Sequence, residues 1–260
     1  MSFAASCLKY VIGGFRHARR TENAETVRRG PDGGGIHILP SAREQVLADL
    51  RRISMLEAAL AAEPLRTGEH GEGAALLDAH SRLIRAARKS GDFVAESDWS
   101  AFGERKRRQS GESEVFFNPA RNYYTKFKNP AAKAAIKRTS PDDWIYEHIL
   151  HNALFANARY DFLGVAECRG EARVVLGQKG IDAELRASDR QVSEIFKGMG
   201  LAPEDHFFFG NELFAITDVG QGGDNALISD DGQVVFIDPL IRVKRPVREI
   251  IGILLSLCPS

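Results

Sequence analysis

Apolar residues recur every three or four positions in several stretches of the chain, which predicts amphipathic helices. The helices are expected over residues 41–63, 74–90, 140–155 and 188–199, with a shorter one over 250–257. Between them, short apolar and β-branched runs bounded by turn residues predict strands. The strands are expected over residues 110–117, 122–127, 160–165, 172–178, 206–210, 213–217, 226–229 and 234–237. Helices mixed with hairpin-forming strands indicate an α+β fold.

The last two of these strands flank an Asp-Gly turn, which is a strong hairpin signal. Asn225 precedes the first strand and Asp238 follows the second. Because strands paired across a tight turn bring their outer ends together, Asn225 and Asp238 are expected side by side. An amide oxygen beside a carboxylate is a ligand set that suits Mg²⁺. Asp218 ends an earlier predicted strand and is a further carboxylate in this region.

A second group of polar residues lies earlier in the chain. A small-residue loop with Gly111 and Ser113 enters a predicted hairpin, where backbone N–H groups can cover phosphates. Lys126 lies inside the second strand of that hairpin, and Glu147 lies on the following helix, which Ser140 is expected to cap. A glutamate at the edge of a buried helix face can hold a lysine by an ion pair. The alternatives are an edge-strand lysine facing water and a surface glutamate.

Composition places limits on the function. The chain has 260 residues, which suffices for one large domain or two small ones, and its net charge is zero. Zero net charge disfavours nucleic acid as a partner, and no apolar run is long enough for a membrane helix. The three cysteines, at positions 7, 168 and 258, show no metal-binding spacing. They are interpreted as reduced thiols, which makes a cytoplasmic location the expected one.

The order of these polar residues resembles the catalytic core of the protein-kinase-like superfamily. The interval from Asn225 to Asp238 matches the usual kinase interval. Three features depart from the kinase pattern. The two residues before Asp218 are Ile-Thr and not His-Arg, and the stretch from Asp218 to Asn225 is two residues longer than usual. Pro-Leu follows Asp238 where kinases have Phe-Gly.

Within this superfamily, the chain resembles the serine/threonine/tyrosine kinase-like domain of bacterial and phage polyvalent proteins. The likeness covers residues from about 74 to 245. The segments that carry it include SGESEVFF, YYTKF, WIYEHILHNALF, YDFLGV and DNALISDDGQVVFIDP. The helix segment HNALF and the final IDP are its most distinctive marks.

The resemblance implies roles for the first group of residues. Lys126 would bind the phosphates of ATP and Glu147 would pair with Lys126. Gly111 and Ser113 would belong to the loop that covers the phosphates. Gln178 would begin the segment that contacts adenine through its backbone.

The resemblance also implies roles for the second group. Asn225 and Asp238 would bind Mg²⁺, and Asp218 would be the catalytic carboxylate. Asp224 is the alternative to Asp218. Asp218 is favoured because it directly ends a strand, which fixes a side chain better than a glycine-rich loop does.

The implied fold is bilobal and protein-kinase-like, with a small antiparallel-sheet N-lobe that holds one helix and a reduced helical C-lobe. Residues 1–39 are expected to be disordered, 40–90 to form a helical extension, 91–245 the kinase-like domain and 246–260 a short helix. The implied function is ATP- and Mg²⁺-dependent phosphoryl transfer to a protein hydroxyl. The alternatives are a pseudokinase or nucleotide-binding interaction module of a mobile-element protein, and a structural fragment of a larger phage-type protein.

Overall fold

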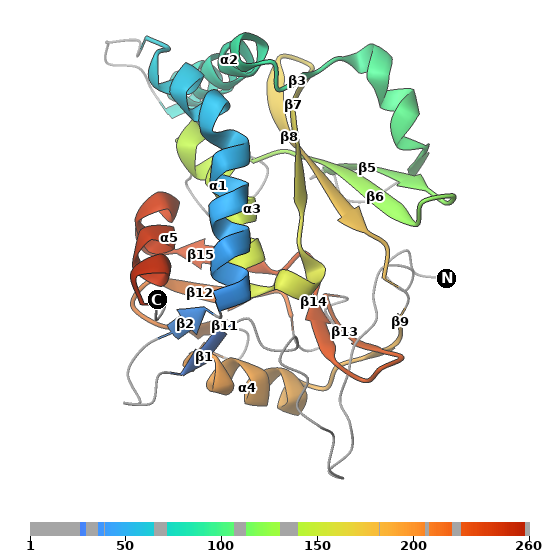
Figure 1. Cartoon of the computed structure of the whole chain (residues 1–260), viewed down its shortest axis with the longest axis vertical. Coiled ribbons are helices and arrows are strands. Elements are labelled where there is room, and N and C mark those ends of the chain that lie inside the picture. Colours follow the sequence, from blue (N-terminus) through green and yellow to red (C-terminus); the bar gives the residue numbers. More distant parts are fainter. Residues whose placement is uncertain are drawn as a thin grey trace. The chain divides into compact units, whose positions relative to one another are not determined.

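The computed structural model describes residues 27–29, 36–38, 40–64, 72–106, 113–130, 140–181, 183–205, 208–219 and 225–257 (Figure 1). The chain divides into two compact units. Residues 47–149 with 160–179 form one, here called the sheet unit. Residues 1–46, 150–159 and 180–260 form the other, here called the hairpin unit. Each unit mixes helices with sheets, so the predicted α+β class is confirmed.

The sheet unit is built on a six-stranded sheet in the order β3-β7-β8-β6-β5-β4. Neighbouring strands are antiparallel except for β3 and β7, which pair in parallel. The strands are β3 (Phe93–Val94), β4 (Glu104–Lys106), β5 (Ser113–Asn118), β6 (Tyr123–Lys128), β7 (Asp161–Cys168) and β8 (Glu171–Lys179). Short connections join β5 to β6 and β7 to β8, whereas a helix lies in the chain between β6 and β7.

The helices lie close to their expected positions. They are α1 (Pro40–Ala61), α2 (Glu72–Ser90), α3 (Pro141–Leu154), α4 (Asp189–Gly198) and α5 (Val247–Ser256), with the 3-10 helices η2 (Glu96–Phe102) and η3 (Ala156–Ala158). Ser188 caps α4 through a capping box with Gln191, and Pro141 is the first residue of α3. Within the described part of the chain, no helix combines the length and apolar character that crossing a membrane requires.

One face of the sheet is covered by an aromatic cluster. Phe116 of β5 and Phe127 of β6 contact each other, with ring centroids 5.2 Å apart. Trp99 and Phe102 of η2 lie 4.8 and 5.7 Å from the Phe127 ring. Because side chains alternate across a strand, this packing directs the residues on either side of Phe127 to the opposite face. The cluster therefore determines which face of the sheet receives Lys126.

Ion pairs connect the two long helices α1 and α2 within the sheet unit. Glu63, just after α1, is buried and binds Arg85 and Lys89 of α2. Hydrogen bonds from these two cations hold the pKa of the Glu63 carboxyl below its usual range. Asp92, after α2, is also buried and accepts from Arg52 at 2.7 Å. A buried carboxylate is stable in a fold only when such partners compensate its charge.

The hairpin unit contains the remaining sheets. Its strands are β1 (Val27–Arg29), β2 (Ile36–Ile38), β9 (Ala183–Arg186), β10 (Ala202–Asp205), β11 (Phe208–Gly210), β12 (Phe214–Thr217), β13 (Ala226–Ser229), β14 (Val234–Phe236) and β15 (Leu240–Val243). The predicted Asp-Gly hairpin is confirmed as β13–β14, with β9 on its outer side, and β12 pairs with β15. Phe155, Phe196 and Phe236 pack together in the core of this unit.

Strands β1 and β2 lie within the stretch of residues 1–39, where the sequence pattern indicated no ordered element. They pair antiparallel, with Arg28 opposite His37. Each strand has three residues, which is too short for an alternating pattern to stand out in the sequence.

Gly103 is required by the path of the chain between η2 and β4. Its φ is 102° and its ψ is −150°, a region that only glycine adopts readily. A Cβ at this position would lie 2.3 Å from the backbone oxygen of Phe117, which cannot move without disturbing the sheet. Gly73 on α2 has open space around its Cβ position.

We predict that Gly103→Ala lowers the free energy of unfolding by about 1–3 kcal/mol, the usual cost of one strained backbone conformation. Gly73→Ala, the matched control, should be neutral or slightly stabilising because alanine favours helix. Chemical denaturation of both variants measures the difference. Equal stabilities of the two variants would contradict the prediction.

Candidate functional site

Three residues predicted to bind nucleotide share one face of the six-stranded sheet. Ser113 of β5 lies opposite Lys128, which follows Lys126 by two positions on β6. Gln178 of β8 lies opposite Tyr124, which precedes Lys126 by two positions. Directly opposed residues point to the same side, and so do residues two apart on one strand. Ser113, Lys126 and Gln178 therefore share one face, whereas Gly111 is outside the described residues.

Lys126 is buried in this face, with 6% of its surface exposed. Its direct neighbours across the strands are Val115 and Leu176, both apolar. The Lys126 ammonium donates a hydrogen bond of 3.1 Å to the hydroxyl of Tyr160, which precedes β7 and is itself buried. The alternative of an edge-strand lysine facing water is wrong, because β6 is a central strand of the sheet.

Helix α3 packs on the same face as Lys126. His148 of α3 stacks on Phe162 with ring centroids 5.2 Å apart, and Phe162 lies opposite Leu176, the neighbour of Lys126. Glu147, next to His148, is half-buried. The helix that carries the glutamate therefore covers the face that carries the lysine. The Lys126–Glu147 ion pair itself stays a prediction.

The hairpin unit contains the second group of candidate residues. The side-chain amide of Asn225 donates to Asp218 twice, at 3.0 Å to the backbone oxygen and at 2.8 Å to the carboxylate Oδ2. Asp218 directly follows β12 and is exposed. The asparagine thus holds both the backbone and the carboxylate of Asp218. Asp224, the alternative catalytic residue, is outside the described residues.

Asp238 is placed near this pair by the backbone. The Asn225 carbonyl accepts from the N–H of Ile237, the residue before Asp238, at 2.9 Å. Thr217, the residue before Asp218, lies opposite Leu240, two residues after Asp238. The β13–β14 ladder thus brings Asp238 near Asn225, and the β12–β15 ladder brings it near Asp218.

Asp218 and Asp238 both adopt left-handed backbone conformations, with φ of 67° and 51°. Among the described non-glycine residues, the other two with positive φ are Asn122 and Arg169, which lie in hairpin turns. Asp218 and Asp238 lie outside such turns. Strained conformations of this kind are frequent at functional sites, because the surrounding structure must hold the residue against the strain.

The arrangement provides oxygen ligands for a hard cation. The amide nitrogen of Asn225 donates to Asp218, which leaves the amide oxygen as the atom of this side chain that can bind a cation. That oxygen and the Asp238 carboxylate are of the type that Mg²⁺ prefers. No cluster of three or more His, Cys, Asp or Glu side chains suited to a metal occurs in the described ranges. An Asn–Asp pair is a smaller set, of the kind that binds Mg²⁺ together with phosphate oxygens.

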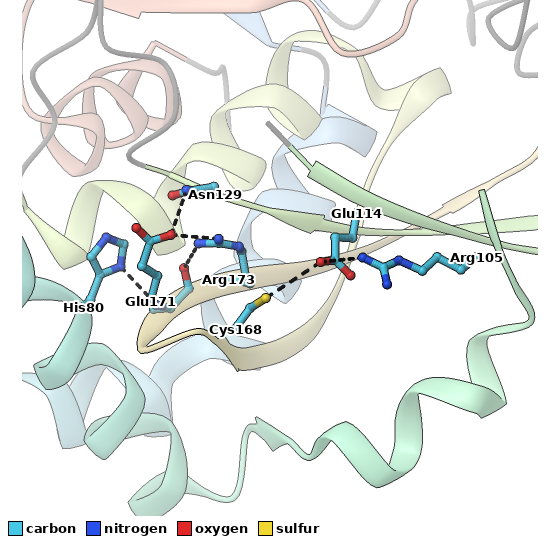
Figure 2. A network of polar contacts seen from close by, with 8 residues as sticks. His80, Arg105, Glu114, Asn129, Cys168, Glu171 and Arg173 are labelled. Atoms are coloured by element: carbon cyan, nitrogen blue, oxygen red, sulfur yellow. Dashed lines mark hydrogen bonds and ion pairs between the residues drawn. The ribbon is translucent and has the colours of Figure 1, made fainter. Parts of the chain in front are cut away.

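Figure 2 shows a polar network at the turn between β7 and β8. Glu171 accepts hydrogen bonds from Arg173 at 2.8 Å and from Asn129 at 3.2 Å. His80 of α2 is buried, packs against the Trp144 ring in a tilted arrangement and accepts from the Ala172 N–H at 3.1 Å through Nδ1. Burial lowers the pKa of His80. This network joins α2 and α3 to the sheet, and its role is structural.

The same figure shows a second small group on the aromatic face of the sheet. Glu114 binds Arg105 at 2.8 Å and lies 3.8 Å from the Cys168 sulfur. Burial, together with the Glu114 carboxylate, raises the pKa of the Cys168 thiol. A raised pKa keeps the thiol protonated and unreactive.

The sequence interpretation missed Tyr160. A tyrosine between a helix and a strand is typical of the apolar core, and 34 positions separate it from Lys126. Tyr160, just before β7, and Phe162 within it are two residues apart, which indicates one face for both, and the pairing of Phe162 with Leu176 identifies that face as the one of Lys126.

Comparison with known families gives one result. The model of the family described as serine/threonine/tyrosine kinase found in polyvalent proteins matches residues 78–245, so the chain belongs to this family of kinase-like proteins. Comparison with curated proteins and with solved structures gives no match.

We predict that the free energy of unfolding decreases as the pH is lowered, because of the protonation of His80. Its pKa is lowered in the folded state, so the unfolded chain binds the proton more readily. The contribution is therefore fully present above the unfolded value near 6.5 and is lost as the pH falls below it. The loss can reach about 1.4 kcal/mol per pH unit for one proton.

His80→Asn tests this prediction, since Asn Oδ1 can accept from the Ala172 N–H but does not titrate. The variant should be less stable than the wild type at pH 7, because it loses the contact with Trp144. Between pH 7 and 5 its free energy of unfolding should fall less steeply than that of the wild type. Denaturant titrations at several pH values give both slopes, and equal slopes would refute the role of His80.

Proposed function

We propose that this chain is a protein-kinase-like phosphotransferase that transfers the γ-phosphoryl group of ATP to a protein hydroxyl. The observation that carries the proposal is the pair of hydrogen bonds from the Asn225 amide to Asp218. Backbone pairing of the neighbouring residues brings Asp238 near these two. The family match supports the same class of activity. In this proposal Asp218 is the catalytic carboxylate, and Asn225 and Asp238 hold Mg²⁺. The bilobal arrangement typical of kinases belongs to the same proposal.

The residues present fit a nucleotide and its metal. Lys126 supplies a cation on a sheet face that it shares with Ser113 and Gln178. Glu147, on the helix that covers this face, is proposed to orient the lysine, as in kinases. Mg²⁺, when bound with ATP, neutralises charge on the phosphates.

Asp218 has the properties of a group that receives a proton. Its carboxylate is exposed, so a substrate hydroxyl can reach it. One carboxylate oxygen, Oδ2, accepts from Asn225, which fixes the orientation of the group. A positioned carboxylate of this kind contributes by accepting the hydroxyl proton as the oxygen attacks phosphorus.

A pseudokinase is the second candidate, and the sequence around Asp218 favours it. Ile216 and Thr217 are buried strand residues at the positions where kinases have His-Arg. A chain of this kind would bind nucleotide, or no ligand, and would act through partners of a mobile-element protein. Transfer activity distinguishes the two candidates.

We predict that Asp238→Asn and Asp218→Asn separate metal binding from chemistry. Asp238→Asn should weaken Mg²⁺-dependent ATP binding, because it removes a charged ligand. Asp218→Asn should leave ATP affinity nearly unchanged and reduce transfer by roughly 10²- to 10⁴-fold, the usual size of general-base help. Thermal-shift titration with ATP, with and without Mg²⁺, and an autophosphorylation assay provide the two measurements.

Two further variants complete the test. Asp230→Asn is the matched control, because Asp230 is exposed in the β13–β14 turn. Asp224→Asn should have little effect if Asp218 is the base. If Asp224→Asn loses phosphoryl transfer and Asp218→Asn retains it, Asp224 and not Asp218 is the catalytic carboxylate. Wild-type ATP binding without any transfer would favour the pseudokinase, and no nucleotide binding at all would refute the proposed function.

A further inference from the structure

A second lysine accompanies Lys126 on the same face of β6. Lys128 is two residues further along the strand, and residues two apart in a strand point to one side. The two ammonium groups lie 5.0 and 4.9 Å from the centroid of the same ring, that of Tyr160. They are therefore at most about 10 Å apart, which is on the order of the Debye length in physiological salt.

The first residue of β5 is the direct neighbour of this second lysine. That residue, Ser113, lies directly opposite Lys128 in the ladder. Side chains directly opposite each other in antiparallel strands are close neighbours. Lys128 thus lies at the Ser113 end of the lysine-bearing face, and Lys126 lies one step further along it.

Tyr160 connects the two lysines. Its hydroxyl accepts a hydrogen bond from the Lys126 ammonium at 3.1 Å. Its ring attracts both cations through the negative charge on the aromatic face. Since Tyr160 is 1% exposed, its ring is fixed by packing and provides a rigid reference for both side chains.

We propose that Lys128 and Tyr160 complete the binding site for the triphosphate chain of ATP. In this proposal Lys128 supplies a second cation to the phosphates. Tyr160 is a positioning residue that holds the Lys126 ammonium at its phosphate-binding position. The proposal rests on the proposed function, because the polyphosphate is taken to be that of ATP.

Charge explains why a polyphosphate suits this cluster. Two cations near one ring repel each other, and a polyanion between or beside them relieves that repulsion. A polyanion is attracted by both cations at once, whereas a neutral ligand is attracted by neither. Adenosine lacks phosphates, so its affinity should not depend on Lys126, Lys128 or Tyr160.

Tyr160→Phe tests the positioning role, because it keeps the ring and removes only the hydroxyl. The affinity for Mg²⁺-ATP should fall about three- to tenfold, the effect of losing one hydrogen bond to a charged group. Affinity for adenosine should not change. Tyr123→Phe is the matched control, because the Tyr123 hydroxyl also makes a hydrogen bond, donating to Asp161 at 2.7 Å. Tyr123 is on β6, like the two lysines, but on the opposite face of the sheet.

Lys128→Gln tests the second cation. Affinity for Mg²⁺-ATP and for inorganic tripolyphosphate should fall roughly tenfold, with a weaker dependence on salt, and Lys128→Arg should restore most of both. Lys179→Gln is the control, because Lys179 is exposed and lies opposite Tyr123 on the other face. Calorimetric titration of the full chain with ATP, tripolyphosphate and adenosine provides all the affinities.

The outcomes separate this inference from the proposed function. If the wild type binds Mg²⁺-ATP but Tyr160→Phe and Lys128→Gln bind it as well as their controls do, the inference is overturned and the proposed function is not. Equal losses for ATP and adenosine in Tyr160→Phe would assign the residue a purely structural role and also overturn it. Tripolyphosphate binding that depends on Lys128 and Tyr160, in a chain that neither binds nor uses ATP, would support the cluster and refute the proposed function. A wild type that binds neither ligand refutes both.

Discussion

A positive charge inside the six-stranded sheet is the constraint on which the sheet unit depends. Lys126 lies on a central strand between Val115 and Leu176, where an apolar side chain would cost less. The Tyr160 hydroxyl accepts a hydrogen bond from its ammonium at 3.1 Å, and a buried charge needs polar partners of this kind. Replacing a buried ion by apolar residues is often neutral or stabilising, so the stability of the fold does not by itself account for a lysine here. A lysine at this position agrees with the phosphate-binding role proposed for it.

The two faces of the sheet differ in character: one is aromatic and apolar, and the other carries the lysines proposed to bind phosphate. The aromatic cluster around Phe127 and Trp99 provides apolar burial on one face. Since side chains alternate along a strand, that packing fixes the register that turns Lys126 and Lys128 to the other face. A slip of β6 by one residue would bury both lysines under η2. The hydrophobic core thus specifies the position of the polar site without touching it.

The sequence predicted elements whose signals are local, and missed features that depend on pairing between distant segments. Helix α4 and the β13–β14 hairpin with its Asp-Gly turn follow from neighbouring residues, and both were correct. The contact between Lys126 and Tyr160 depends on how β6, β8 and β7 pair, which no local pattern encodes. The pairing of β9 with β13 was missed for the same reason, because about 40 residues of chain separate these strands. Asn225 and Asp238 could be placed together beforehand, since one tight turn connects their strands.

Asp218 is held by a side chain seven residues later in the chain, that of Asn225. In kinases an Arg stands directly before the catalytic Asp, whereas here Thr217 is buried at the end of β12. The Asn225 amide, at the other end of the loop, donates to both the backbone oxygen and the carboxylate of Asp218. A donor that contacts both atoms restricts the backbone as well as the side chain, which suits a residue with a φ of 67°. The longer loop between the two residues is compatible with this contact because both of its ends are fixed, one by the β12–β15 ladder and the other by the β13–β14 ladder.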